Sequence, residues 1–321
     1  MLVPVIDISD FATGSNEQRA AIGAAIDRAC REVGFFSVVG HGVDEAVINE
    51  AHRMALRFFD LALSERRDAE PDDVSYPYGY RPFSVESLNR SIGGAALADL
   101  KETMNIGPVG EPARPRSEMT DADERAVFAP NLWPAALPEL RPAIEAYYDA
   151  MADLSATLLD VFAEALGLDA GWFRPFIDQH GSALRLAHYP ALDVAPPQGS
   201  FRAGAHSDYG TLTILRLDEE PGLQVQSAAG EWGDVDAPGG ALVVNLGDLM
   251  QRWTNDRWRS TMHRVVVPDN GGAVRRLTMP FFHNANWDAL VECIVQPGDE
   301  ARHEPVEAGP YLMSKFRSTV I

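Results

Sequence analysis

The amino-acid sequence predicts a mainly β fold with flanking helices (α+β), in which an α-rich N-terminal region precedes a barrel or jelly roll. Three observations lead to this prediction. Amphipathic helical patterns dominate the first 61 residues, and one long amphipathic segment covers 138–168. After residue 180, short β-rich runs separated by Gly, Pro, Asp or Asn recur at intervals of about 8 to 15 residues. Such spacing is typical of barrels and jelly rolls, and not of parallel βαβ units.

The N-terminal part is expected to alternate helix and strand. Apolar residues at helical spacing predict a helix over 16–34, with Asn16 as its N-cap. The run FFSVV (35–39) has the composition of a buried strand, and a second amphipathic helix follows over 43–61. The segment 64–135 is rich in Pro, Gly and Asp, so it is expected to be loop with short elements at most.

The later part of the chain carries the predicted strands. They are expected over 182–189, 210–217, 222–227, 230–235, 241–247, 261–267, 275–283 and 290–295. A helix over 309–318 closes the chain. We expect an α-rich region over 1–115 and a jelly-roll catalytic region over 116–321, which together form one compact structural unit.

Composition and charge limit the classes of function. The chain has 321 residues, of which 46% are hydrophobic and 23% charged, as in ordinary globular proteins. Its formal net charge of -20 would repel a phosphate backbone, so nucleic acid is not expected as a partner. No apolar run reaches the ~18 residues that a membrane span needs. The start of the chain lacks the pattern of a signal peptide, and the two cysteines, Cys30 and Cys293, form no disulfide framework. These features favour a cytoplasmic protein.

A histidine and an aspartate two residues apart are the first candidate for chemistry. His206 and Asp208 lie in AHSDYGTLTIL (205–215), where residues two apart in an extended segment point to one face. His263 lies in a strand pattern 55 residues after Asp208 and can supply a third ligand. Two histidines and one carboxylate form a facial triad that leaves coordination positions open, which suits non-haem Fe(II) and O₂. The His-x-Asp spacing alone also occurs by chance or as a structural hydrogen bond.

A second group of residues suits the binding of a carboxylate. Arg276 and Thr278 are two apart on a predicted strand, so a guanidinium and a hydroxyl face the same way. An arginine beside a hydroxyl is a good receptor for a carboxylate. Tyr189 in RLAHYP can donate a hydrogen bond into the barrel. The alternatives are a surface arginine paired with an acidic residue, and a tyrosine that only packs in the core.

The order of these segments resembles a known family, the isopenicillin N synthase-like branch of the Fe(II)/2-oxoglutarate-dependent dioxygenases. The resemblance covers nearly the whole chain, and no single motif carries it. The similar segments are VPVIDISDF, GFFSVVGHGV, DLKETMNIGP (99–108), LRLAHYP, AHSDYGTLTIL, GLQVQ, VVNLGDLMQRWTNDRWRSTMHRVV and RRLTMPFFHNANWD.

The resemblance implies a double-stranded β-helix (jelly-roll) core and a set of roles for the candidate residues. It implies that the metal ligands already singled out bind iron, and that Arg276 and Thr278 hold the distal carboxylate of 2-oxoglutarate with help from Tyr189. The family usually has Ser where Thr278 stands, and Thr keeps the hydroxyl. The family often has Asn where Ala187 stands here, which puts one polar contact near the co-substrate in doubt.

The expected function is that of an oxidoreductase, a non-haem iron dioxygenase of secondary metabolism. It would use Fe(II), 2-oxoglutarate and O₂ to oxidise an unactivated C–H bond of a small molecule by hydroxylation or desaturation, with release of succinate and CO₂. The identity of the substrate and the choice of reaction outcome stay open. We expect a monomer or a weak homo-oligomer. Candidate substrate contacts around the barrel mouth are Tyr78, Tyr80, Phe201, Trp253 and Phe282, although each of these also suits core or rim packing.

Three alternative functions also stay open. The first is an isopenicillin N synthase-type oxidase of the same fold, in which the arginine and hydroxyl pair holds a carboxylate of the substrate itself and 2-oxoglutarate is not used. The second is a metal-free, barrel-shaped binding protein. The third is a zinc hydrolase, which the absence of an HExxH sequence disfavours.

Overall fold

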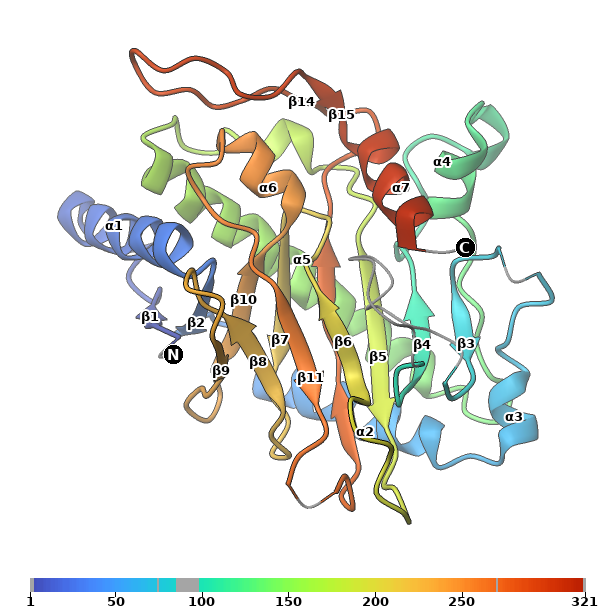
Figure 1. Cartoon of the computed structure of the whole chain (residues 1–321). Helices are drawn as coiled ribbons and strands as arrows, with labels where there is room; N and C mark the ends of the chain where they lie inside the picture. The colour runs from blue at the N-terminus through green and yellow to red at the C-terminus, as the bar shows by residue number, and fades with distance from the viewer. Residues whose placement is uncertain (1–2, 74, 85–97, 270, 320–321) are drawn as a thin grey trace.

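The computed structural model describes residues 3–73, 75–84, 98–269 and 271–319, and its main feature is a pair of facing β-sheets (Figure 1). The larger sheet has nine strands in the described residues, in the order β1-β2-β10-β7-β13-β5-β4-β3, with β12 also paired to β5. Its strands are β1 (Val5–Asp7), β2 (Phe35–Val39), β3 (Gly79–Arg81), β4 (Glu102–Ile106), β5 (Ala183–Tyr189), β7 (Leu212–Arg216), β10 (Leu242–Leu246), β12 (Arg276–Thr278) and β13 (Phe281–His283).

The smaller sheet lies in front of the larger one in Figure 1, in the order β6-β11-β8-β9. Its strands are β6 (Phe201–His206), β8 (Leu223–Gln226), β9 (Trp232–Asp234) and β11 (His263–Val266). A separate hairpin pairs β14 (Leu290–Val291) with β15 (Val306–Glu307). Apolar side chains from both main sheets meet between them in one buried cluster that includes Val225, Val243 and Val265. The two sheets therefore enclose a common interior, as the predicted jelly roll requires.

Helices cover the outer face of the larger sheet. The helices of the described residues are α1 (Asn16–Glu32), α2 (Glu45–Phe59), α3 (Leu63–Arg67), α4 (Ala122–Val127), α5 (Leu140–Leu166), α6 (Asp248–Trp253) and α7 (Ala308–Thr319), with 3-10 turns η2 (Arg116–Glu118) and η3 (Arg174–Phe176). Of these, α1 and α5 contact strands of the larger sheet. The long helix α5 runs behind the sheet and packs against α1 and α2 (Figure 1). It ends at Gly167, whose φ of +71° is the left-handed conformation that glycine adopts at helix ends. The apolar stripe of α5 buries against the sheet and so forms the second, larger core of the molecule.

The structure differs from the sequence expectations at several local points. The strand expected over 290–295 is only the two-residue β14, which pairs with β15. The strand β6 was not expected, because its sequence FRAGAH is poor in β-branched residues. The single strand expected over 275–283 is split into β12 and β13 around Pro280, which has no N–H to donate to a strand partner. Helix α1 is capped by Ser15 and not by Asn16, since the Ser15 hydroxyl accepts from Gln18 N–H in a capping box.

The N-terminal region takes part in the sheet as well as supplying helices. It contributes β1, β2, β3 and β4 to the larger sheet, with β4 paired along five residues of β5. The boundary at residue 115 therefore does not coincide with a break in the sheet, and the division of the chain there remains a prediction. Among the described helices, none combines the length and the apolar character needed to cross a membrane.

Candidate active site

The end of β6 brings two histidines and an aspartate together. His206 is the last residue of β6, and it pairs directly with His263, the first residue of β11. The pairing register shifts between this point and Val265, and such irregularities redirect side chains near functional sites. Asp208 lies in the loop after β6. The sequence analysis associated His206 and Asp208 with the strand that follows them, whereas the structure places His206 at the end of β6 and Asp208 in the loop after it.

The three side chains point one ligand atom each at a common centre. Asp208 Oδ1 lies 3.8 Å from His206 Nε2 and 3.7 Å from His263 Nε2. The two imidazole rings lie 4.3 Å apart between centroids. One ligand atom from each side chain lies within 4.8 Å of the other two, which is close enough for the three to hold one metal ion. Among the described residues, no other group of histidine, cysteine or carboxylate side chains converges in this way. The arrangement matches a site made of two histidines and one carboxylate.

Hydrogen bonds fix which atom of each ligand is available. His206 Nδ1 donates to the carbonyl oxygen of Gly204 at 2.7 Å, and His263 Nδ1 donates to that of Thr261 at 3.1 Å. A carbonyl oxygen can only accept, so both Nδ1 atoms carry a proton, and in the neutral form of each ring Nε2 is then the nitrogen with the free lone pair. Metal-bound histidines are commonly held by such an N–H contact on the other ring nitrogen. The donor set therefore fits a divalent metal.

Two polar side chains of the larger sheet hold the other oxygen of Asp208. Its Oδ2 accepts from Thr213 Oγ1 at 2.6 Å and from Asn245 Nδ2 at 2.7 Å. Thr213 on β7 and Asn245 on β10 are directly opposite each other in the sheet, so both point to the interior from one face. The sequence analysis missed these two residues. The signal it could have used is a polar residue inside an apolar buried strand, as in LVVNL.

The electrostatics of the cluster suit metal binding. Burial, followed by the charge of the neighbouring His263, lowers the pKa of His206 to about 3, so its imidazole is neutral at neutral pH. Burial would raise the pKa of Asp208, but the two histidines and the hydrogen bonds from Asn245 and Thr213 outweigh it and keep that pKa below its usual value. A neutral His206 beside an ionised Asp208 is in the protonation state that metal binding needs.

A buried ion pair supports β6 from the side of β4. Lys101 Nζ lies 2.9 Å from Asp99 Oδ2, and both residues are buried. Asp99 Oδ1 accepts from the N–H of Gly204 at 3.0 Å. The carbonyl of that same glycine holds His206, so the ion pair fixes the backbone that orients this imidazole. The sequence analysis did not assign a role to either residue.

Two further contacts hold the loop around Asp208. The N–H of Asp248, at the start of α6, donates to the carbonyl of Asp208 at 2.8 Å. Asp248 Oδ2 in turn accepts from Lys315 of α7 at 2.7 Å, and the ring of Tyr209 packs edge-on against Phe316 of α7 at 5.4 Å. The C-terminal helix therefore lies against the loop that carries the aspartate.

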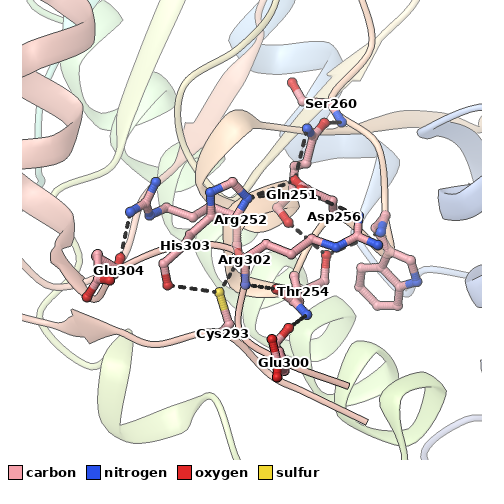
Figure 2. A network of polar contacts seen from close by, with 12 residues as sticks. Gln251, Arg252, Thr254, Asp256, Ser260, Cys293, Glu300, Arg302, His303 and Glu304 are labelled. Carbon is pink, nitrogen blue, oxygen red and sulfur yellow. Dashed lines mark hydrogen bonds and ion pairs between the residues drawn. The ribbon is translucent and has the colours of Figure 1, made fainter. Parts of the chain in front are cut away.

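Figure 2 shows the network that fixes the connection between α6 and β11. Gln251 Oε1 accepts from Ser260 N–H at 2.7 Å, three residues before His263. Asp256 accepts from His303 Nε2 at 3.0 Å, which ties the long loop between β14 and β15 to the end of α6. These contacts place the start of β11, and therefore His263.

The predicted carboxylate receptor also lies in the interior. Arg276 of β12 is directly opposite Tyr189 of β5, and Thr278 is opposite Ala187. The Arg276 guanidinium is buried and lies 5.3 Å from the centre of the Tyr189 ring, and its Nε donates to Glu220 O at 3.1 Å. The alternative of a surface arginine is therefore wrong. Ala187 is buried in the apolar cluster between the sheets and offers no amide at the position of the usual Asn.

The five candidate substrate contacts fall in different places, and one of them faces the interior beside the cluster. Phe282 is directly opposite Thr213, so it shares the face that carries the partners of Asp208. Phe201 packs under the guanidinium of Arg264 at 5.4 Å. Trp253 is buried among the aromatic rings next to η3, including Phe173 at 5.1 Å.

The two tyrosines lie outside the space between the sheets. Tyr80 is buried against Phe58 of α2, and its hydroxyl donates to Glu102 Oε2 at 2.5 Å. Tyr78 is also buried, donates to the carbonyl of Val127 and packs closely against Gly107. Both hydroxyls are thus occupied within the protein.

Comparison with known proteins identifies the family. The model of the N-terminal region of a non-haem dioxygenase in morphine synthesis matches residues 3–136, and that of the 2OG-Fe(II) oxygenase superfamily matches residues 180–285. The 2-oxoglutarate-Fe(II) type oxidoreductase hxnY of Emericella nidulans is 32% identical over 98% of this chain and 90% of its own length. The chain belongs to the 2OG-Fe(II) oxygenase superfamily.

Other similar proteins agree with this assignment of the chain to the oxygenase superfamily. Validamycin A dioxygenase of Streptomyces hygroscopicus subsp. limoneus is 31% identical over 98% of this chain and 85% of its own length. The crystal structure of a full-length Neurospora crassa protein in complex with alpha-KG matches with a TM-score of 0.86 and 28% identity, over 99% of this chain and 96% of that one. The predicted fold, a double-stranded β-helix with an α-rich N-terminal region, is confirmed.

The predicted reaction class is confirmed as well. The oxygenase is a non-haem dioxygenase that depends on Fe(II) and 2-oxoglutarate and uses O₂. It oxidises a C–H bond of a small molecule with release of succinate and CO₂. These relatives support this function, and not that of an oxidase that does without 2-oxoglutarate or of a metal-free binding protein.

Proposed function

We propose that His206, Asp208 and His263 bind the Fe(II) of this oxygenase. The observation that carries the proposal is the convergence of one ligand atom from each side chain, while the other polar atom of each is held by a separate hydrogen bond. A ligand whose second atom is engaged is fixed in orientation before the metal arrives, which lowers the cost of binding.

Arg276, Thr278 and Tyr189 form the receptor for the distal carboxylate of 2-oxoglutarate. The support is their position on the paired strands β5 and β12, facing the same interior as the metal ligands, with a buried guanidinium available to an anion. When bound, the iron and the co-substrate supply the oxidising power, and the protein supplies orientation and the exclusion of water.

The prime substrate meets the side chains that line the interior near the metal cluster. Phe282 is our principal candidate for an apolar contact, because it lies beside Thr213 on the face that points inward. The surroundings of the other four candidates, Tyr78, Tyr80, Phe201 and Trp253, do not support a contact with substrate. We propose a cytoplasmic enzyme of secondary metabolism that is a monomer or weak homo-oligomer. We also propose that it does not bind nucleic acid, because its net charge of -20 would repel a phosphate backbone.

The test is an anaerobic titration with Fe(II) and 2-oxoglutarate, followed by the metal-to-ligand charge-transfer band. The wild type should develop the band, and His263→Ala and Asp208→Ala should not. His41→Ala is the matched control, because its imidazole contacts the carbonyl of Gly240 away from the cluster and it should behave as wild type. A band that survives in both ligand variants would overturn the assignment. Succinate release that depends on a candidate substrate then identifies the substrate class.

A further inference from the structure

A second buried arginine lies beside the proposed co-substrate receptor. Arg202 of β6 has a relative exposure of 1%, and Arg276 of β12 has one of 2%. The guanidinium carbons of the two lie 5.9 Å and 5.3 Å from the centre of the Tyr189 ring. Two guanidinium groups from two different sheets therefore meet at one tyrosine in the interior.

The protein satisfies these two charges only in part. Arg202 Nη2 donates to the carbonyl of Val274 at 2.5 Å, and its Nη1 lies 4.0 Å from Glu220 Oε1, which is beyond hydrogen-bond distance. Arg276 Nε donates to the backbone carbonyl of Glu220. Within the part of the chain that the structure describes, Nη1 of both arginines is buried without a hydrogen-bond partner. A buried donor of a charged group that has no acceptor is costly, and a bound ligand, ion or water is one explanation for such a group in a native protein.

The electrostatics point in the same direction. Burial, followed by the charge of Arg276, lowers the pKa of Arg202. Two like charges that are buried next to each other attract an anion, and a carboxylate accepts from two guanidinium groups at once. The inference rests on the proposed function, in which the anion bound beside Arg276 is the distal carboxylate of 2-oxoglutarate.

We propose that Arg202 is a second binding residue for this carboxylate, which is held between Arg202 and Arg276. Arg202 thereby contributes to the selection of a 2-oxo acid that has a second carboxylate over one that lacks it.

The test measures binding to the Mn(II)-loaded protein by calorimetry, without turnover, with two probes. 2-Oxoglutarate has the distal carboxylate, and pyruvate is a 2-oxo acid without it. Arg202→Met should weaken 2-oxoglutarate binding by about 10- to 100-fold and leave the affinity for pyruvate unchanged. Arg202→Lys keeps the charge and should lose less. Arg264→Met is the matched control, since that arginine stacks on Trp232 at 4.1 Å in the same sheet and should change neither affinity.

Each outcome decides the matter. A loss confined to 2-oxoglutarate supports the proposal. An equal loss for both acids means that Arg202 only maintains the shape of the site, and unchanged affinities mean that it does not contact the ligand; either result overturns the proposal. If Arg202→Met does not fold, Arg202→Gln, which also removes the charge, gives the same decision with the same two probes. Failure of the wild-type protein itself to bind 2-oxoglutarate would instead contradict the proposed receptor as a whole.

Discussion

The two hydrogen bonds to Asp208 Oδ2 give the sharpest test of how the sheet controls the metal cluster. They come from Thr213 at 2.6 Å and Asn245 at 2.7 Å, and both are buried. Without them, the carboxylate can rotate, and its second oxygen is left without a donor. Asn245→Leu removes one bond and keeps an apolar group of similar size in a strand that is otherwise apolar.

The magnitude follows from the role of these bonds. Partners that orient a metal ligand typically change metal affinity by about 10- to 100-fold, which corresponds to about 1.4 to 2.7 kcal/mol. We expect this loss for Asn245→Leu and for Thr213→Val. Because both donors share one oxygen, the losses in the double variant should not simply add, and the coupling between them should be about 0.5 kcal/mol or more.

The assay is Mn(II) binding by calorimetry in the absence of 2-oxoglutarate, together with thermal unfolding to confirm that each variant folds. Thr103→Val is the matched control, because the Thr103 hydroxyl is buried without a hydrogen-bond partner among the described residues. It should bind Mn(II) like the wild type. If Asn245→Leu and Thr213→Val also bind Mn(II) within about twofold of the wild type, the second oxygen of Asp208 does not control metal affinity, and the reasoning is wrong.

Four further outcomes are expected. Arg276→Met should raise the KM for 2-oxoglutarate by at least about tenfold in a succinate-release assay, and an unchanged KM would refute its role. Phe282→Ala should raise the KM for the prime substrate more than that for 2-oxoglutarate, and the reverse order would contradict its placement. Ser15→Ala should cost about 0.5 to 2 kcal/mol of unfolding free energy in a denaturant titration, since it removes the cap of α1. Burial would raise the pKa of Glu102, but the hydrogen bonds from His188 and Tyr80 and the charge of Arg66 outweigh burial and lower that pKa below 4.5. The ionised carboxylate therefore stabilises the fold above pH 4.5, and this stabilisation is lost on acidification. Glu102→Gln should flatten the dependence of unfolding free energy on pH in this range, and curves for variant and wild type that run parallel would contradict the assignment.

The sequence by itself determined the class of fold, and it also predicted the metal-ligand set that we propose. The spacing of short strands after residue 180 indicated a jelly roll, because strands of a closed double sheet must be short and separated by turns. The His-x-Asp pair and the strand histidine were found because metal chemistry needs these residue types at short spacing. Local patterns carry this information, since a helix period or a two-residue repeat is visible in a window of a few residues.

Only the tertiary structure decided how these residues act together. The strand that carries His206 has a weak local pattern, and pairing with β11 makes it a strand. Thr213 and Asn245 lie 32 residues apart in the sequence, yet they are neighbours across two strands and converge on one carboxylate oxygen. The meeting of Arg202 and Arg276 at Tyr189 depends on the facing of two sheets. Such contacts form between distant segments as the chain buries its apolar faces, and nothing in the adjacent sequence specifies them.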